Sequence, residues 1–295
     1  MNLSEYFDKQ SIIRNGTFIK TMFPKTSEPY SICYAMQQFH LEVALSNQNI
    51  SAIITTKELS SLVDEDLGLV LVENPKLSYY QLHNFLVEKN LTPIHTEHFV
   101  HPTAQVAPTA IIGNHVVIGE GVIISHGAII NDYTVIGAGT YIGENVVISV
   151  RGMQDTYVNG EFFPIRYAGG VKIGSKCEVL SGAIIQKPYH AYYTEIGDDS
   201  KISVKVVVGH GVKIGCGTMV AGNTQIAGNV VIGEHVWIGP STTIADGLTI
   251  GDYAQVKIGS VVIEDVEHDQ QVSGNFAVDH KRQLRIHAKI KNGQF

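Results

Sequence analysis

The chain has 295 residues, of which 44% are hydrophobic, enough for one large domain or two modest ones. Its formal net charge of −7 argues against a nucleic-acid-binding protein, which usually carries a basic patch. The three cysteines are far apart without metal-like spacing, and the sequence shows neither a signal-peptide pattern nor an apolar run long enough for a transmembrane helix. We therefore expect a cytoplasmic protein with reduced thiols.

Residues 1–98 have the pattern of a small α/β domain. The expected elements are strands at 51–56 and 69–72 and helices at 57–65 and 79–89. Asn74-Pro75 is expected to form a turn, and Ser78 to cap the second helix with Gln81 in the capping-box position.

From Val100 onward, every sixth residue is aliphatic over long stretches, and glycine often follows it, as in Ile118-Gly119 and Ile238-Gly239. Neither the helical period of 3.6 nor the strand period of 2 explains a period of six. A triangular prism does, because each hexad forms one flat side with its aliphatic residue pointing inward, and glycine and asparagine serve at the corners. Residues 99–266 are therefore predicted to form a left-handed parallel β-helix, and the fold class is mainly β.

Two segments interrupt the period, residues 150–170 and 186–195, and both are rich in aromatic and charged side chains. Insertions in a solenoid lie on its surface and often form its binding face. The alternative is that these loops only shield the prism.

His210, in the segment VVVGHGVKIG, is the best candidate for a catalytic base, because it lies between two glycines at a predicted corner where substrate could approach. Gly228 follows one coil later, and its backbone N–H would lie about 5 Å along the prism axis, where it could stabilise an oxyanion. These two groups suit acyl transfer from a thioester to an amine.

A zinc site is the alternative use of histidine on such a prism, because stacked histidines could bind the metal. His115 and His126 are 11 residues apart and His210 and His235 are 25 apart, and neither spacing is a whole number of coils. We therefore expect no metal.

Residues 267–295 are expected to form a basic C-terminal extension, in which HKRQLRIHAKIKNGQF has five lysines and arginines and no acidic side chain. Lys281 and Arg282 could receive the phosphates of coenzyme A or an acidic carrier protein. A solvated terminal segment is an equally weighted alternative.

Several segments carry a resemblance to a known family. They are SAIITT, VENPKLSYYQLHNFL, VISVRGMQDTYVNGEFFPIRYAGGVKIG, GAIIQKPYHAYYTEIGDDSKI and VGHGVKIGCGTMVAGNTQIAGNVVIG. Together they resemble, over about residues 50–285, the UDP-3-O-acylglucosamine N-acyltransferases of the lipid A pathway and related enzymes acting on nucleotide-linked amino sugars. His210 and Gly228 match that family's catalytic histidine and oxyanion glycine. The resemblance implies a homotrimer with active sites between prisms, a nucleotide-binding N-terminal domain, and an acyl-CoA or acyl carrier protein thioester as cosubstrate.

The sequence departs from that family at several positions. A second histidine of the family falls here on Gly247, beside Asp246, and the stretch that grips uracil is replaced by CYAMQQFHLEV, in which Tyr34 or Phe39 could stack on a base. In the first loop, Arg166 and Tyr167 are candidate sugar or phosphate contacts. These departures favour a relative that acts on another amino sugar, for example in O-antigen or other surface-glycan synthesis, over the lipid A enzyme itself.

Three hypotheses follow from the sequence. The first is an N-acyltransferase for a nucleotide-linked amino sugar, with His210 as the base. The second is a zinc hydratase on the same prism, and the third is a scaffold without chemistry, in which the loops would be packing elements.

Overall fold

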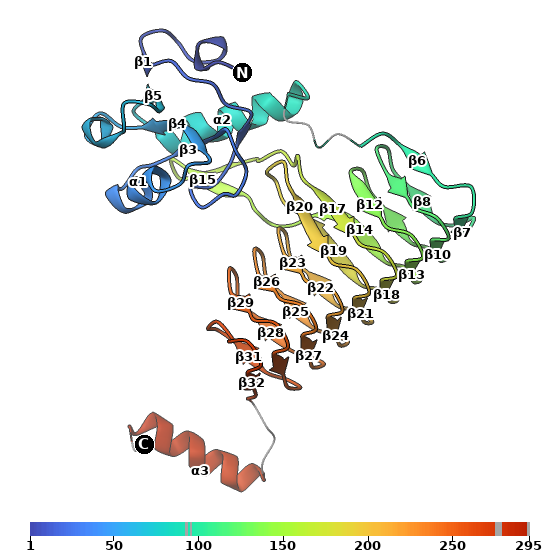
Figure 1. The fold of residues 1–295 in the computed structure, drawn as a ribbon. Helices are drawn as coiled ribbons and strands as arrows, with labels where there is room; N and C mark the ends of the chain where they lie inside the picture. The colour runs from blue at the N-terminus through green and yellow to red at the C-terminus, as the bar shows by residue number, and fades with distance from the viewer. Residues whose placement is uncertain (92–93, 95, 275–278, 294–295) are drawn as a thin grey trace.

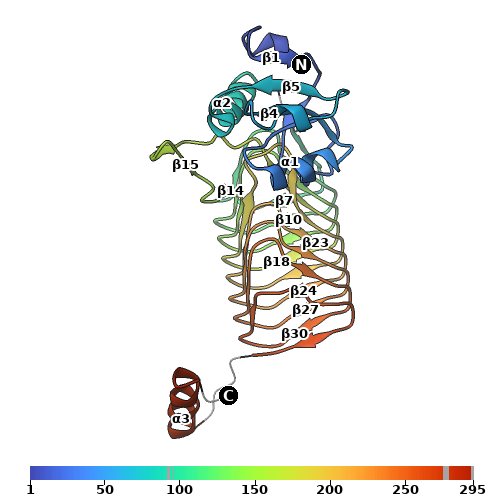
Figure 2. The ribbon, with the colours of Figure 1, turned by 90° about the vertical axis from the view of Figure 1, so that its left-hand side faces the viewer.

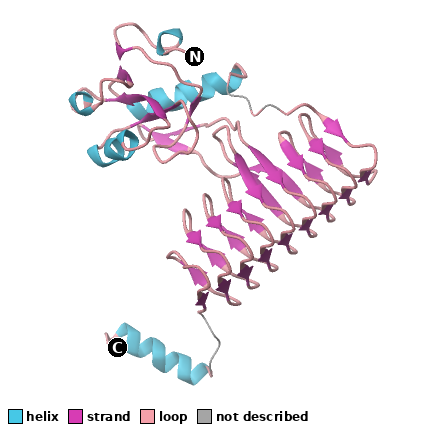
Figure 3. Ribbon diagram, viewed as in Figure 1, coloured by secondary structure: helices cyan, strands magenta, loops and turns pink. Residues whose placement is uncertain are grey.

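A computed structural model describes residues 1–91, 94, 96–274 and 279–293. It consists of a small N-terminal domain with strands and helices, a long prism of short strands, and a C-terminal helix (Figure 1). Figure 3 shows that the helices are confined to the two ends of the chain, while the prism is built of strands and turns.

The prism has three parallel sheets, which the chain visits in the repeating order sheet 1, sheet 2, sheet 3. Sheet 1 contains β6 (Phe99–Val100), β9 (Val117–Ile118), β12 (Thr134–Ile136), β17 (Gly170–Ile173), β20 (Tyr193–Ile196), β23 (Lys213–Ile214), β26 (Val231–Ile232) and β29 (Thr249–Ile250). Sheet 2 contains β7 (Gln105–Val106), β10 (Ile123–Ile124), β13 (Tyr141–Ile142), β18 (Glu178–Val179), β21 (Lys201–Ile202), β24 (Met219–Val220), β27 (Trp237–Ile238), β30 (Gln255–Val256) and β32 (Gln271–Val272). Sheet 3 contains β8 (Ile111–Ile112), β11 (Ile129–Ile130), β14 (Val147–Arg151), β19 (Ile184–Lys187), β22 (Val207–Val208), β25 (Gln225–Ile226), β28 (Thr243–Ile244) and β31 (Val261–Val262).

The six-residue period of the sequence sets the register in which successive coils of the prism pair. In an uninterrupted coil each aliphatic residue pairs with the one 18 positions away, as Ile124 pairs with Ile142 and Ile226 with Ile244. These side chains are buried in one continuous core, and burying each isoleucine contributes about 2 kcal/mol relative to exposure. The predicted left-handed β-helix is confirmed, and the fold class is mainly β.

Both interruptions of the repeat leave the prism at the same corner, where sheet 3 ends and sheet 1 begins. The first is longer and carries a hairpin of β15 (Thr156–Val158) and β16 (Glu161–Phe163). The second runs between β19 and β20. We call this edge the loop corner; it comprises residues 149–170, 186–193, 209–212, 227–230 and 245–248 of successive coils.

The N-terminal domain has a five-stranded sheet in the order β1-β5-β4-β3-β2. Its elements are β1 (Ile12–Arg14), β2 (Lys20–Thr21), β3 (Ser31–Tyr34), β4 (Ile50–Thr55), β5 (Gly68–Leu71), α1 (Gln38–Leu45), α2 (Pro75–Glu88) and the 3-10 turns Leu3–Glu5 and Ser60–Leu62. The two predicted strands correspond to β4 and β5, whereas β1, β2, β3 and α1 were not predicted.

Two local predictions in this domain were wrong. Helix α2 begins at Pro75 and not after Ser78, because the Asn74 side chain accepts the Leu77 N–H at 2.9 Å and Pro75 suits the first helical turn. The predicted helix at 57–65 is only the single 3-10 turn Ser60–Leu62.

The N-terminal domain packs on the two loops through buried polar contacts. The Tyr79 hydroxyl of α2 lies 2.6 Å from Nε2 of His190 in the second loop. His83 lies between Thr21 Oγ1 at 2.6 Å and the carbonyl oxygen of Arg166 in the first loop at 2.9 Å. Two views at right angles show the domain against the prism edge from which these loops extend (Figures 1 and 2).

Beyond residue 266 one further strand, β32, pairs with β30 and so adds a rung to the prism within the range predicted to be an extension. The basic segment then forms helix α3 (His280–Lys291), which Asp279 caps through the Arg282 N–H. Among the described residues, no helix is both long and apolar enough to cross a membrane.

The contact between domain and loops predicts acid sensitivity. Burial lowers the pKa of His83 from 6.5 to about 4, so its stabilising contribution is present above pH 6.5 and is lost as the pH falls toward 4. The full contribution is about 3 kcal/mol. Urea unfolding measured between pH 7.5 and 4.5 should show the midpoint falling with pH, and His83→Gln should reduce that fall. An equal fall in wild type and variant would contradict this account.

Candidate functional site

The predicted catalytic pair lies on the loop corner, in the two coils that follow the loops. The Asn229 N–H donates to the carbonyl oxygen of His210 at 2.8 Å, and the Gly247 N–H donates to that of Gly228 at 2.9 Å. His210, Gly228 and Asp246 therefore occupy equivalent corner positions in three consecutive coils. The corner gathers both loops and these three residues along one edge of the prism.

The His210 ring lies directly over Gly228. A Cβ atom placed on Gly228 would be only 2.1 Å from Cε1 and 2.4 Å from Nε2 of that ring, so only glycine leaves room for the imidazole there. Gly228 itself is buried, and the structure gives its N–H no hydrogen-bond acceptor within the described part of the chain. The N–H is thus a candidate donor to a developing oxyanion, and the neighbouring imidazole is a candidate base.

The first loop covers part of His210, which the sequence did not indicate. Gln154 reaches the histidine with its side-chain Nε2, which lies 3.0 Å from Nδ1. A Cβ on Gly152, in the same loop, would lie 3.6 Å from the Cδ2 atom of the ring. The corner is therefore less open than its two glycines indicated: His210 is partly buried, since the loop closes over one edge of its ring.

Burial lowers the pKa of the His210 imidazole below its ordinary value, and the negative charge of Asp246 acts in the opposite direction. A lowered pKa leaves the ring neutral at pH 7, which is the form that accepts a proton. Asp246 is exposed and lies close enough to act on the ring electrostatically, so it belongs to this site.

The second loop contributes Tyr192, whose hydroxyl donates to Asn229 Oδ1 at 3.1 Å. Burial, together with the Asp246 charge, raises the pKa of Tyr192 to about 12, so the phenol remains a neutral donor. Tyr192 and Asn229 thereby join the second loop to the coil that carries Gly228.

A cavity of about 800 Å³ opens beside this corner, between the N-terminal domain, the second loop and the outer face of sheet 1. Its lining includes Lys20, Phe23, Lys25, Tyr192, Gly211, Lys213, Asn229 and Gly247. Lys20 is paired with Glu28 at 2.7 Å, while Lys25 and Lys213 have no ion-pair partner within 4 Å in the described ranges. The cavity thus has aromatic and cationic walls and reaches the corner residues that flank His210 and Gly228.

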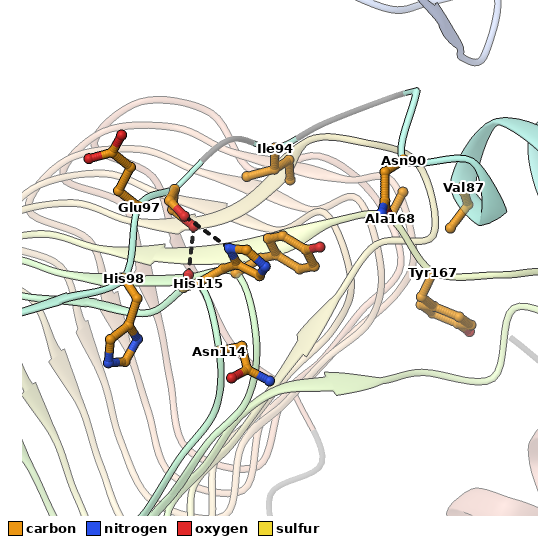
Figure 4. A pocket seen from close by; sticks show the side chains of 11 residues that line it. Val87, Asn90, Ile94, Glu97, His98, Asn114, His115, Tyr167 and Ala168 are labelled. Carbon is orange, nitrogen blue, oxygen red and sulfur yellow. Dashed lines mark hydrogen bonds between the residues drawn. The ribbon is translucent and has the colours of Figure 1, made fainter.

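A second cavity, of about 760 Å³, lies at the same corner near the start of the prism (Figure 4). There the rings of His115 and Tyr133 stack with centroids 5.1 Å apart, and Nδ1 of His115 lies 3.2 Å from the carbonyl oxygen of Thr96. His115 is therefore held as a packing residue two coils before the loops, and this cavity does not include His210.

The predicted loop contacts have different partners from those expected. The Arg166 guanidinium pairs with Glu88 of α2, so it holds the loop to the N-terminal domain. The Tyr167 hydroxyl donates to the Gly152 carbonyl oxygen at 2.6 Å and accepts the Gln154 N–H at 3.2 Å. Tyr167 therefore supports the loop segment that contacts His210.

The predicted base-stacking residues are separated by the fold. The Tyr34 ring packs against Tyr79 and Tyr80, with centroids 5.0 and 6.2 Å away, and is partly buried in the domain core. Phe39 lies on α1 and is 65% exposed. Phe23, which lines the cavity beside the loop corner, is better placed for such a contact. Lys281 and Arg282 lie on helix α3, where both are exposed.

Within the described residues, no group of three or more histidine, cysteine, aspartate or glutamate side chains is arranged to hold a metal ion. Zinc would need three protein ligands and an open position for hydratase chemistry. The nearest groups to His210 are an amide, a glycine and one exposed carboxylate, and this set does not fit zinc.

Comparison with known proteins supports the repeat and identifies no activity. A profile described as bacterial transferase hexapeptide (six repeats) matches residues 229–264, and the search of curated proteins gave no match. Among solved structures, UDP-N-acetylglucosamine acyltransferase from Campylobacter jejuni is 22% identical over 65% of this chain and 83% of that chain, with a TM-score of 0.48. The Francisella novicida UDP-N-acetylglucosamine acyltransferase is 23% identical over 65% and 72%, with a TM-score of 0.39. The acetyltransferase domain of PglB from Neisseria gonorrhoeae is 15% identical over 84% and 97%, with a TM-score of 0.25.

The contact between Gly228 and His210 predicts the effect of a methyl group. Gly228→Ala should displace the imidazole and move its pKa toward the ordinary value, as followed by NMR titration of the histidine ring. Gly222→Ala is the matched control, because the three atoms nearest its Cβ would belong to Val204 and Ser203, none closer than 3.2 Å. An unchanged His210 titration in Gly228→Ala would show that the ring does not occupy this position.

Proposed function

We propose that the protein is an acyltransferase that moves an acyl group from an acyl-CoA or acyl carrier protein thioester to the amine of a nucleotide-linked amino sugar. The observation that carries the proposal is the placement of a partly buried imidazole over the glycine whose N–H has no acceptor in the described part of the chain and could bind an oxyanion. This pair supplies the two groups that aminolysis of a thioester needs.

In the proposed reaction the sugar amine attacks the thioester carbonyl carbon, and His210 Nε2 accepts a proton from the amine. The Gly228 N–H stabilises the negative charge on the carbonyl oxygen. The C–S bond then breaks as the amide C–N bond is completed, and the proton passes from His210 to the departing thiolate. The neutral state of His210 at pH 7 suits the first of these steps.

The cavity beside the loop corner is the proposed site of a phosphate-bearing substrate. Lys25 and Lys213 can pair with phosphate oxygens, and Phe23 offers an aromatic face at the same opening. The nucleotide-linked sugar carries phosphates next to a planar base, and the acyl thioester carries phosphate next to a pantetheine arm. Both of these cosubstrates must reach His210. A role in O-antigen or other surface-glycan synthesis belongs to this proposal, with the lipid A N-acyltransferase as the alternative.

We also propose that the chain forms a homotrimer through the outer face of sheet 3. Along that face, successive coils pair Ile111, Ile129, Val147, Ile184 and Val207 with one another, giving an unbroken aliphatic row. Ile111 is 60% exposed in the single chain. A contiguous apolar surface of this kind typically marks a protein–protein contact, and closed symmetry favours a small ring of identical chains.

The outer face of sheet 1 differs, because the corresponding positions include Lys172, Glu195 and Lys213. The loop corner lies where sheet 3 meets sheet 1, so an interface on sheet 3 would bring a neighbouring chain beside His210.

The catalytic role is tested by His210→Asn. Amide formation, followed by mass spectrometry with UDP-, dTDP- and GDP-linked amino sugars and with acetyl-CoA or 3-hydroxyacyl carrier protein, should fall about 10²- to 10⁴-fold. The control His235→Asn removes an exposed histidine from a different corner and should retain activity. Activity preserved in His210→Asn, or no product from any wild-type pair, would refute the proposal.

The oligomer is tested by placing a charge in the aliphatic row. Ile129→Arg should convert a trimer into monomers in analytical ultracentrifugation, because three buried guanidinium groups would lack partners. Ile123→Arg, on sheet 2 of the same coil and 41% exposed in the single chain, should leave the trimer intact. A wild-type monomer, or a trimer disrupted only by Ile123→Arg, would contradict the assignment.

A further inference from the structure

Gln154 contacts the candidate base at the nitrogen that faces away from the reaction. A histidine that acts through one ring nitrogen depends on what its other nitrogen binds, because that bond selects the tautomer and the ring orientation. A carboxylate or a backbone carbonyl is the usual hydrogen-bond partner of this second ring nitrogen. In this protein a side-chain amide from the first loop lies 3.0 Å from His210 Nδ1.

The orientation of this amide determines which tautomer His210 adopts. With Gln154 Nε2 facing Nδ1, the proton would have to be on His210 Nε2, which would leave no lone pair there for a substrate. The Gln154 side-chain oxygen is then buried without a hydrogen-bond partner in the described part of the chain. Rotating the Gln154 side-chain amide by 180° exchanges its oxygen and its nitrogen, which have nearly the same size and shape. The oxygen then accepts the Nδ1–H of His210. That arrangement gives the buried oxygen a partner and leaves the Nε2 lone pair free.

The first loop holds Gln154 in place through Tyr167. The Gln154 N–H donates to the Tyr167 hydroxyl at 3.2 Å, and this hydroxyl donates to the Gly152 carbonyl oxygen at 2.6 Å. The Arg151 guanidinium lies 5.6 Å from the centre of the Tyr167 ring and within 3.7 Å of the Asp155 carboxylate. The Gln154 backbone is therefore held by Tyr167, and the residues on either side of it, Arg151 and Asp155, are paired with each other. These contacts fix the segment from which the Gln154 side chain reaches His210.

An amide at this position has a chemical consequence that a carboxylate would not have. A carboxylate would stabilise the protonated imidazole and so raise its pKa, whereas an amide oxygen fixes the tautomer without adding charge. The charged group that acts on His210 is Asp246, from the coil beyond Gly228. The Tyr167 and Tyr192 phenols of the two loops bond to Gln154 and Asn229, the neighbours of this site. Because Asp246 is exposed, water screens its charge and weakens its effect on the His210 pKa. The loop amide adds no charge of its own, so the imidazole stays neutral near pH 7.

We propose that Gln154 is the positioning residue for His210: its side-chain oxygen accepts the Nδ1–H, holds the ring over Gly228 and leaves Nε2 to take the proton from the substrate amine. This inference rests on the proposed function for the identity of the substrate. The contact itself concerns only the ring and the loop, so it can be tested without substrate.

The test measures the tautomer and the titration of His210 by nitrogen-detected NMR of the imidazole, with the signal assigned by its loss in His210→Asn. In the wild type the neutral ring should carry its proton on Nδ1. Gln154→Leu should remove that preference, and Gln154→Glu should raise the pKa of His210 by about one unit or more. Gln105→Leu and Gln105→Glu, at an exposed position on β7, are the matched controls and should change neither.

Kinetics give the second measurement. Gln154→Leu should lower kcat about ten- to a hundredfold with little change in KM, and Gln154→Glu should move the acidic limb of the pH–rate profile upward with the His210 titration. An unchanged tautomer and titration in both folded Gln154 variants would overturn the proposal, even if kcat fell. The expected NMR changes in a protein that transfers no acyl group would uphold the positioning contact and refute the proposed function instead.

Discussion

The stacking of one coil on the next, 18 residues apart, is the constraint on which the rest of the structure depends. Parallel strand pairing and the buried isoleucine and valine column fix the register of every coil. Corner residues therefore align as strictly as core residues do, although they lie outside the aliphatic core. Because the register is shared, a residue at one corner meets its counterpart in the next coil: His210 lies over Gly228, and Asp246 follows. A shift of one residue would move His210 from the corner onto a flat side and bury a polar residue in the core.

The two insertions build on this register and disturb it only locally, with one irregularity between Ile148 and Val150 where the first loop leaves the prism. Before and after the first loop, β14 and β19 still pair, and β17 and β20 pair across the second. Both loops can therefore extend from one corner and meet the N-terminal domain, which packs on them through Tyr79, His83 and His190. The domain thereby holds the loops, and the first loop in turn reaches His210 through Gln154. In this way the small domain supports the candidate site without supplying its reacting groups.

Much of this arrangement could be predicted from the sequence, because the prism is periodic. The period of six locates the coils up to residue 266, both loops, and the neighbouring positions of His210 and Gly228, which require only counting; it misses the last strand, β32. The loop contacts could not be predicted in that way, since Gln154 and Tyr192 lie in segments without periodicity and reach the corner through irregular backbone. Tyr34 illustrates the same limit: its aromatic ring suggested base stacking, but the sheet order places it against Tyr79 and Tyr80. Helix α2 was misplaced at its start because Asn74 and Ser78 are both good caps, and only the tertiary path selects Asn74.

The central claim is that the loop corner at His210 and Gly228 is where the acyl group is transferred. The most direct test is a crystal structure with an unreactive acyl-CoA analogue, in which a methylene group replaces the thioester sulfur and the carbonyl is retained. We expect the analogue's carbonyl oxygen to lie about 3 Å from the Gly228 nitrogen, with its carbonyl carbon beside His210 Nε2 and its phosphates in the cavity lined by Lys25 and Lys213. An analogue bound elsewhere, such as in the cavity at His115 and Tyr133, with the loop corner empty, would contradict the account.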